Sequence, residues 1–353
     1  MNTKIMKNIN SINYMTVLLI IIWNTACNQN NSKTNKFESA KQIDQLDAES
    51  LNVKWNHPLN KVGRLHSPLV EVQPFNLNGK FYLLECWRSR WDWPGQPNES
   101  AGKNDEMWIA HLPNGPEDYK GRKYISAALK GNTLGTAIVW KERVYVYGVN
   151  EESGRQYVEM TWSQDLEKWS EPVKVFDSPE GKIFNVSLTR DDNGFVFLWE
   201  TNGLGKPFTM CFGRIDSLTD NWNDHIIENA VYGEQKYTGG PEVIFENGWY
   251  YLLYLEALKP GWETRITRSK NLINWEDAPQ DRPFIPFSKH HKNLPLHEPH
   301  VQEINASDPG ITVYGDEVIV YFTGGIQKRG GDLQWAKFNG TVNELMTTFF
   351  PSY

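Results

Sequence analysis

The sequence predicts an all-β fold, a five-bladed β-propeller, from two observations. The first is a hairpin pattern, in which a short strand, a tight turn and an aromatic-rich strand follow one another, that occurs five times. Residues 239–254 show it most clearly, with Asn247-Gly248 at the turn because both residues tolerate positive φ. The second is the even spacing of Trp169, Trp222 and Trp275 at intervals of 53 residues. A period near fifty residues is typical of propeller blades, and a β-sandwich would not predict it.

The five copies define the expected blades. We expect the first strands at residues 67–72, 135–140, 185–190, 240–245 and 308–313. The second strands are expected at residues 78–85, 141–148, 193–200, 247–254 and 315–322. Two of the tryptophans end near-identical segments, Ser-x-Asp/Asn-Leu-x-x-Trp, at 163–169 and 269–275, and residues 216–222 form a looser version. These segments add a third landmark to the repeat.

The first 27 residues have the pattern of an export signal. Lys4 and Lys7 precede an apolar stretch, residues 15–23, that is too short for an ordinary transmembrane helix. Thr25-Ala26-Cys27 follows and resembles a bacterial lipoprotein signal, in which the cysteine is lipidated. We therefore expect a signal peptide at 1–27, a flexible polar tether at 28–58 and the propeller at 59–353. The protein would be exported and anchored by lipid to a bacterial membrane, on its periplasmic or cell-surface face.

Charge and cysteine content exclude some functions. The formal net charge of −7 argues against a nucleic-acid partner, because a phosphate-binding surface usually has a basic excess. Three cysteines are too few for a disulfide framework, and we expect Cys86 and Cys211 to be buried thiols. The 15 Trp and 15 Tyr residues suit a β-rich core, and flat rings also stack on sugar faces.

The predicted fold brings particular residues to one end of a central channel. The first strands of all blades run the same way along the channel, so equivalent residues converge. The copies align on Pro68, Thr136, Val186, Pro241 and Pro309, and the residues before and after each of these share one strand face because strand side chains alternate. We expect the mouth to hold Ser67, Asn185, Ser187, Glu242 and Asp308, with Glu71 further along the face in blade one and Glu85 and Glu200 at the rim.

Two carboxyl groups at one mouth are what hydrolysis of a glycosidic bond needs. One protonates the leaving oxygen, and the other activates water or attacks the anomeric carbon. Their environments must differ so that one stays protonated near neutral pH. Glu242 and Asp308 could instead simply cap strand starts. Their equivalent registers in adjacent blades favour catalysis, with Glu242 as general acid, Asp308 as general base or acid modulator and Glu71 as another candidate base.

Other residues near the mouth are expected to position the substrate. These are His66, Ser67, Arg88, Asn185, Glu200 and His300. Arg88 would be either a clamp for a carboxylate or sulfate on the sugar or the partner of a salt bridge at a strand end. No residue spacing matches a metal site, so neither a metal nor another cofactor is expected in catalysis. A structural calcium ion in the channel remains an open alternative.

Three motifs give the chain a family resemblance. They are the Ser-x-Asp/Asn-Leu-x-x-Trp segments, Gly240-Pro241-Glu242 with its aromatic second strand, and Ser307-Asp308-Pro309-Gly310. With these motifs the chain resembles the five-bladed-propeller glycoside hydrolases of families 43, 32, 117 and 130, over about residues 60–350. The resemblance implies an acid at Glu242 and, in families 43 and 117, inversion of the anomeric centre.

The resemblance also exposes a departure. It implies an early base Asp followed by Pro, where this chain has Ser67-Pro68, so the base would be Asp308, Glu71 or another residue. We expect an exported, inverting glycoside hydrolase acting on plant or algal poly- or oligosaccharides. The alternatives are a non-catalytic glycan-binding lipoprotein on the same scaffold and a propeller that binds protein.

Overall fold

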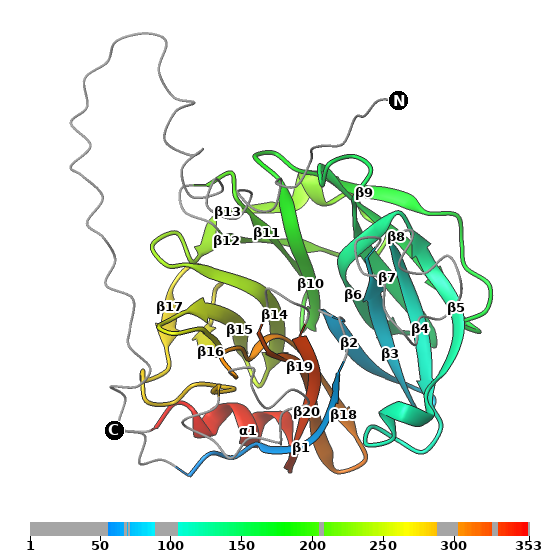
Figure 1. Ribbon diagram of the computed structural model, residues 1–353. Coiled ribbons are helices and arrows are strands. Elements are labelled where there is room, and N and C mark those ends of the chain that lie inside the picture. Colours follow the sequence, from blue (N-terminus) through cyan, green and yellow to red (C-terminus); the bar gives the residue numbers. More distant parts are fainter. Residues whose placement is uncertain are drawn as a thin grey trace, which may run out of the picture. The chain divides into compact units, whose positions relative to one another are not determined.

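Five antiparallel sheets of four strands each surround a central axis in the computed structural model of the chain (Figure 1). The structure describes residues 56–66, 69, 71–88, 105–204, 208–287, 303–326 and 331–351, without the side chain of His66. The predicted five-bladed, all-β propeller is therefore confirmed. The leader with Cys27, most of the tether, Ser67 and His300 lie outside the described residues.

Each blade is built from strands that are consecutive in the chain, except in blade five. Blade one contains β2 (Val72–Leu77), β3 (Lys80–Trp87), β4 (Glu106–Leu112) and β5 (Lys123–Lys130). Blade two contains β6 (Asn132–Trp140), β7 (Arg143–Asn150), β8 (Tyr157–Ser163) and β9 (Val173–Asp177). Blade three contains β10 (Ile183–Asp191), β11 (Gly194–Thr201), β12 (Thr209–Ile215) and β13 (Ile226–Tyr232). Blade four contains β14 (Thr238–Glu246), β15 (Trp249–Ala257), β16 (Trp262–Ser269) and β17 (Trp275–Asp277).

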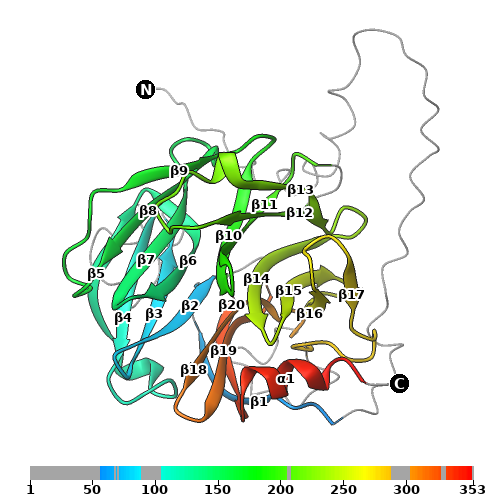
Figure 2. The ribbon, with the colours of Figure 1, turned by 180° about the vertical axis from the view of Figure 1, so that it is seen from behind.

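Blade five closes the ring with strands from both ends of the domain. It contains β18 (Ser307–Tyr314), β19 (Glu317–Gly325), β20 (Gly331–Asn339) and, as its outer strand, β1 (Asn60–His66). β1 pairs antiparallel with β20, and Figure 2 shows the two beside helix α1 (Val342–Thr348). This pairing joins the two ends of the domain by backbone hydrogen bonds. Blade five therefore holds the propeller closed, because its sheet contains strands from both ends of the domain.

The helices are short and peripheral. α1 begins with a capping box in which the Thr341 side chain and Glu344 each bond the other's backbone N–H. Two 3₁₀ turns, η3 (Tyr119–Gly121) and η4 (Trp222–His225), lie between outer strands and bury Tyr119 and Trp222. Among the described residues no helix is long and apolar enough to cross a membrane.

The five inner hairpins confirm the predicted repeat. Each joins its first and second strands by a two-residue turn, at 78–79, 141–142, 192–193, 247–248 and 315–316. Asn78, Gly79, Asn247 and Gly248 all have positive φ, which matches the twist of the flanking strands. In the third landmark, the Ser163 hydroxyl accepts a hydrogen bond from the Leu166 N–H. Cys86 and Cys211 are buried free thiols, as expected.

The strand registers correct our alignment in two blades. Counted from the hairpin turn, the residues equivalent to Glu242 are Gln73, Thr136, Ser187 and Gly310. In blade one the first strand is Val72–Leu77, so the prediction of 67–72 was wrong. Ser67-Pro68 resembles the residue-plus-proline segments at Pro241 and Pro309, which is why it was aligned with them. The pairing of Leu77 with Lys80 at the turn determines the actual register of the strand. In blade two the residue equivalent to Pro241 is Gly135 and not Thr136, so the alignment there was wrong by one residue.

The same count shows a repeated irregularity where the inner strands begin. Two residues before the Glu242 level lie Glu71, Leu134, Gly240 and Asp308, and all four have positive φ, between 51° and 60°. In blades two, four and five the ladder shifts register at this point. In blade three the shift falls between Ile183 and Asn185. Positive φ is costly for residues other than glycine and is concentrated at functional sites, so this ring of positions is where a site is expected.

Candidate active site

All five blades contribute to a narrow cavity at the end where the inner strands begin. The cavity has about 20 Å³ of space, room for about one water molecule. Its lining residues are Glu71, Val72, Gln73, Gly135, Asn185, Val186, Gly240, Pro241, Glu242, Asp308 and Pro309. Apart from Glu71, which directly precedes β2, these residues lie on the inner strands β2, β6, β10, β14 and β18, which surround the axis in Figure 1. Three of the expected residues with carboxyl groups, Glu71, Glu242 and Asp308, thus meet in one cavity.

Glu71 is held by an ion pair with Arg88. One terminal nitrogen of Arg88 donates to Glu71 Oε1 at 2.7 Å and to Oε2 at 2.5 Å. Both side chains are about nine-tenths buried. Burial alone would lower the pKa of Arg88, but the Glu71 carboxylate raises it. A buried guanidinium needs a countercharge, and Glu71 is the carboxyl group that supplies it. The arrangement is the salt-bridged alternative for Arg88.

Asp308 faces Glu71 from the neighbouring blade. The Ser307 hydroxyl donates to Asp308 Oδ2. Asp308 Oδ1 packs over Gly240, where an added Cβ would lie 2.3 Å from it. Burial, and secondly the Glu71 charge, raise the pKa of Asp308 to about 7. Asp308 is therefore suited to carry a proton near neutral pH, whereas Glu71 is engaged in the ion pair with Arg88.

Glu242 lies deeper along the axis. Gln73 Nε2 donates to Oε1 at 3.1 Å and the Ser187 hydroxyl donates to Oε2 at 3.0 Å. Ser187 is itself fixed by the Val243 N–H. Glu242 and Gln73 line both this cavity and a second one at the opposite end of the inner strands. Burial raises the pKa of Glu242 to about 8, so it too is suited to hold a proton.

Glu200 supports the mouth from the second strand of blade three. Its Oε2 accepts from Asn185 Nδ2 at 2.8 Å and from the Gly240 N–H at 3.0 Å. It therefore links Asn185 to the glycine against which Asp308 packs. Burial, and then the charges of Asp308 and Glu71, raise its pKa to about 8. Glu71, Glu200 and Asp308 thus form one electrostatically coupled group.

Glu85 is not at this rim, contrary to our expectation. It is fully buried in blade one and accepts hydrogen bonds from Tyr119, Tyr124 and Trp87. Arg122 lies 3.1 Å away as its countercharge. Glu85 is five residues beyond the start of β3, whereas Glu200 is six beyond the start of β11. Because strand side chains alternate, this one-residue difference puts them on opposite faces.

Sequence reasoning missed two features of the site: Gln73, and the packing of Asp308 against Gly240. Gln73 belongs to the same register as Ser187 and Glu242, and counting back from the Asn78-Gly79 turn would have found it. Gly240 was recognised only as part of a blade start, because the sequence carries no signal of which neighbour approaches its missing Cβ.

The described residues offer no evident metal site. They contain no group of three or more His, Cys, Asp or Glu side chains that could hold an ion. The four carboxyl groups around the mouth are matched with Arg88, amides and hydroxyls instead.

Comparisons with known proteins address the fold. Neither a protein-family model nor a curated protein sequence matches the chain. Solved structures do. The α-L-arabinofuranosidase PaAbf62A of Podospora anserina, in complex with cellotriose, aligns with a TM-score of 0.58 at 10% identity, over 80% of this chain and 97% of that one. The Bacillus subtilis arabinanase Arb43A aligns at 0.53 and 10%, over 83% and 100%. The Bacteroides ovatus xyloglucan-locus protein GH43B aligns at 0.54 and 16%, over 79% and 53%.

These neighbours define the class of fold. The chain has the five-bladed β-propeller seen in glycoside hydrolases of families 43 and 62, and its motifs had suggested the fold of family 43. At these identities the likeness concerns the fold. The function has to be argued from the mouth itself.

Proposed function

We propose that this protein is a glycoside hydrolase that cleaves O-glycosidic bonds in plant or algal poly- or oligosaccharides. One observation carries the proposal. Two carboxyl groups in one cavity have opposite environments, Glu71 beside a guanidinium and Asp308 buried beside a carboxylate. Such a division between a proton donor and a proton acceptor is what glycosidic hydrolysis requires.

In this scheme Asp308 is the general acid. It protonates the glycosidic oxygen as the bond to the anomeric carbon breaks. Glu71, kept as a carboxylate by Arg88, is the general base and takes a proton from the attacking water. Attack from the face opposite to the leaving group inverts the anomeric centre. Glu200 and Asn185 hold Gly240 and the mouth in place.

Glu242, which the sequence indicated as the acid, has a different place in the scheme. Both of its oxygens accept hydrogen bonds from protein side chains. We assign it to the floor of the cavity, where its carboxyl group in the protonated form faces the bound sugar. Its rival role as general acid is tested alongside that of Asp308.

The test is hydrolysis of a panel of arabino-, xylo-, xyloglucan- and sulfated algal oligosaccharides by the full-length protein. Asp308→Asn and Glu71→Gln should each lower kcat by about 10²- to 10⁴-fold, the usual contribution of a general acid or base. Glu242→Gln should have a smaller effect on kcat. Glu246→Gln, at the far end of the same strand as Glu242, is the matched control and should behave as wild type.

Three results would contradict the proposal. If Glu242→Gln abolishes turnover while Asp308→Asn retains it, the acid is Glu242. If the product forms with retained configuration, as seen by proton NMR of the fresh anomer, the inverting scheme is wrong. If the wild-type protein binds members of the panel without turnover, the glycan-binding alternative replaces the hydrolase.

We also propose that the protein is exported and lipid-anchored through Cys27. The support is the charged, apolar and small-residue order of the first 27 residues. Labelled palmitate fed to expressing cells should appear in the wild-type protein and be absent from Cys27→Ser. Labelling of both proteins, or of neither, would contradict it.

A further inference from the structure

Three aromatic side chains stand at the mouth beside the carboxyl groups. Phe184 directly precedes Asn185, Phe208 lies at the entry to β12, and Tyr237 lies at the entry to β14. The ring centroids of Phe184 and Phe208 are 4.4 Å apart, and those of Phe208 and Tyr237 are 6.0 Å apart, nearly edge to face. We call these three rings the aromatic rim. Such packing fixes the orientation of each ring against its neighbour.

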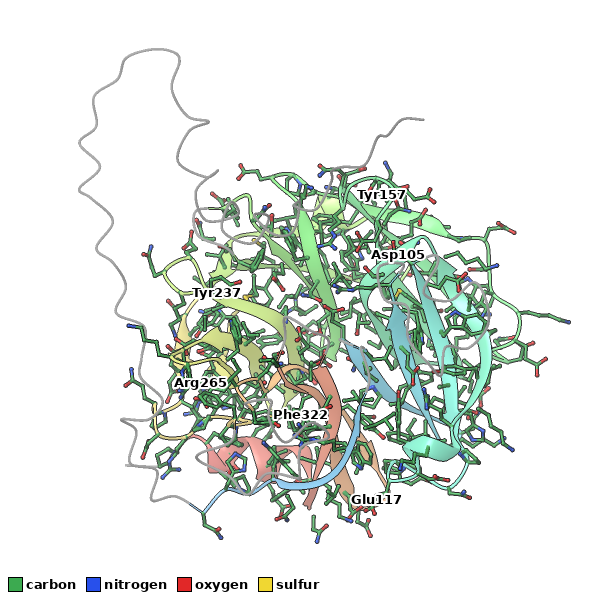
Figure 3. The ribbon with its side chains drawn as sticks, viewed as in Figure 1. Asp105, Glu117, Tyr157, Tyr237, Arg265 and Phe322 are labelled. Atoms are coloured by element: carbon green, nitrogen blue, oxygen red, sulfur yellow. The ribbon has the colours of Figure 1, made fainter. Side chains whose placement is uncertain are left out.

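Tyr237 is unusual in its exposure. Its side chain is 46% exposed, and in the part of the chain that the structure describes it is the only aromatic among the exposed large hydrophobic residues. Its backbone is nevertheless fixed, since its carbonyl accepts from the Ala257 N–H at 3.1 Å. The neighbouring Thr238 hydroxyl donates to the Phe208 carbonyl. Figure 3 labels the side chain. An exposed ring on a fixed backbone is a preformed contact surface.

The aromatic rim borders the candidate catalytic groups. A Cβ placed on Gly239 would lie 3.5 Å from Glu200 Oε1 and 3.9 Å from a Phe208 ring carbon, so both side chains border this glycine. The pKa of Tyr237 is raised by burial and then by the charges of Glu200 and Asp308, which places its hydroxyl within their field. The Arg155 guanidinium lies 5.3 Å from the Phe184 ring centre, within the range of a cation–π contact.

We propose that the aromatic rim is a sugar-binding subsite in which a neutral sugar ring of the substrate stacks on Tyr237. A sugar ring has a face of C–H groups and an edge of hydroxyl groups. An aromatic ring matches the C–H face, and neighbouring polar groups can form hydrogen bonds with the hydroxyls. The charge around it does not favour acidic sugars. The two guanidinium groups that the structure describes near the rim, those of Arg88 and Arg155, are already ion-paired with Glu71 and Glu151, so neither is a ready countercharge for a sugar carboxylate. The proposal rests on the proposed function and names the class of its substrate.

The test measures binding and turnover separately. Binding of arabinotriose, xylotriose and trigalacturonate is followed by calorimetry, using the full-length Asp308→Asn protein so that nothing is consumed. In this background, Tyr237→Ala should raise the Kd of whichever neutral trisaccharide binds by about tenfold. Tyr237→Phe keeps the aromatic ring, so its Kd should equal that of the parent protein. In the active protein, Tyr237→Ala should raise KM by a similar factor with kcat nearly unchanged. Ile273→Ala, exposed at the outer edge of the same blade, is the control and should change neither.

The outcomes separate this proposal from the proposed function. Unchanged affinity in Tyr237→Ala, equal loss in Tyr237→Phe, tighter binding of trigalacturonate than of the neutral sugars, or no binding by any of the three would each overturn the subsite. If the affinity falls as expected while the wild-type protein hydrolyses nothing, the subsite stands and the hydrolase proposal fails. Thermal unfolding of each variant, together with Phe208→Leu as a second change in the aromatic rim, shows whether a loss reflects misfolding.

Discussion

The two ends of the inner strands differ, although the same five strands form both. At the mouth, a residue with positive φ lies in or directly before four of the inner strands, and carboxyl and amide groups contribute to the cavity lining. At the opposite end the hairpins close in regular two-residue turns, around a cavity of about 380 Å³. That cavity is lined largely by apolar residues, among them Phe75, Ile138, Leu188, Ile244 and Ile311.

The difference shows how a repeated fold acquires a site. Regular turns and apolar packing at one end follow the local preferences of the sequence. At the other end buried carboxyl groups and left-handed residues oppose stability, and the surrounding ladders hold them in place. If this division is correct, changes at the mouth should affect function and stability together, whereas matched changes at the far end should affect stability alone.

The largest expected effect comes from breaking the ion pair at the mouth. Glu71→Gln leaves a buried guanidinium without its countercharge, which should destabilise the fold by about 3–5 kcal/mol and also lower kcat. Glu71→Gln with Arg88→Gln removes both charges and should recover most of the stability but none of the activity. Chemical denaturation and hydrolysis assays measure the two effects. Recovery of activity in the double variant would show that Glu71 is not the base.

Alanine substitution should have a smaller effect on stability at two glycines, Gly240 in β14 and Gly248 in the turn that follows it, and only one of the two variants should lose activity. Gly240 and Gly248 both have positive φ, at +51° and +78°, so alanine should cost each about 1–2 kcal/mol. An alanine at Gly248 meets nothing within 4 Å, whereas at Gly240 its Cβ would lie 2.3 Å from Asp308 Oδ1. Gly240→Ala should therefore also reduce kcat by at least tenfold, because Asp308 is displaced, while Gly248→Ala should retain it. Equal kcat values in the two variants would contradict the seating of Asp308 on Gly240.

The contrast between the two ends also explains what could be predicted from the sequence. The hairpins and the blade count depend on adjacent residues, Asn-Gly turns and aromatic strands, so they were visible in the sequence. The pairing of β1 with β20 joins residues some 270 positions apart and leaves no local pattern. The mouth was recognised through Asn185, Glu242 and Asp308, whose blades were aligned correctly. The blade-one partner Glu71 was underrated, because Ser67-Pro68 gave a false alignment that only the ladder resolves.

The last prediction concerns the pH dependence of stability. Burial holds the folded pKa of Glu242 at about 8, above the ordinary value near 4.3 that it has when unfolded. The folded protein therefore binds more protons than the unfolded chain between about pH 4 and pH 8. The stabilisation from protonated Glu242 is fully present below about pH 4 and is lost as the pH rises through about 8.

Glu242→Gln keeps the neutral shape and cannot ionise, so its stability should decline less than that of the wild type between pH 5 and pH 9. Part of the decline should remain, because Glu200 and Asp308 also have raised folded pKa values. Denaturation curves at several pH values measure this slope, and Glu246→Gln at the regular end of β14 should leave it unchanged. If the slope is the same in Glu242→Gln as in the wild type, Glu242 is ionised in the folded protein. The floor of the mouth would then carry a negative charge, and Glu242 would have to be reconsidered as a base.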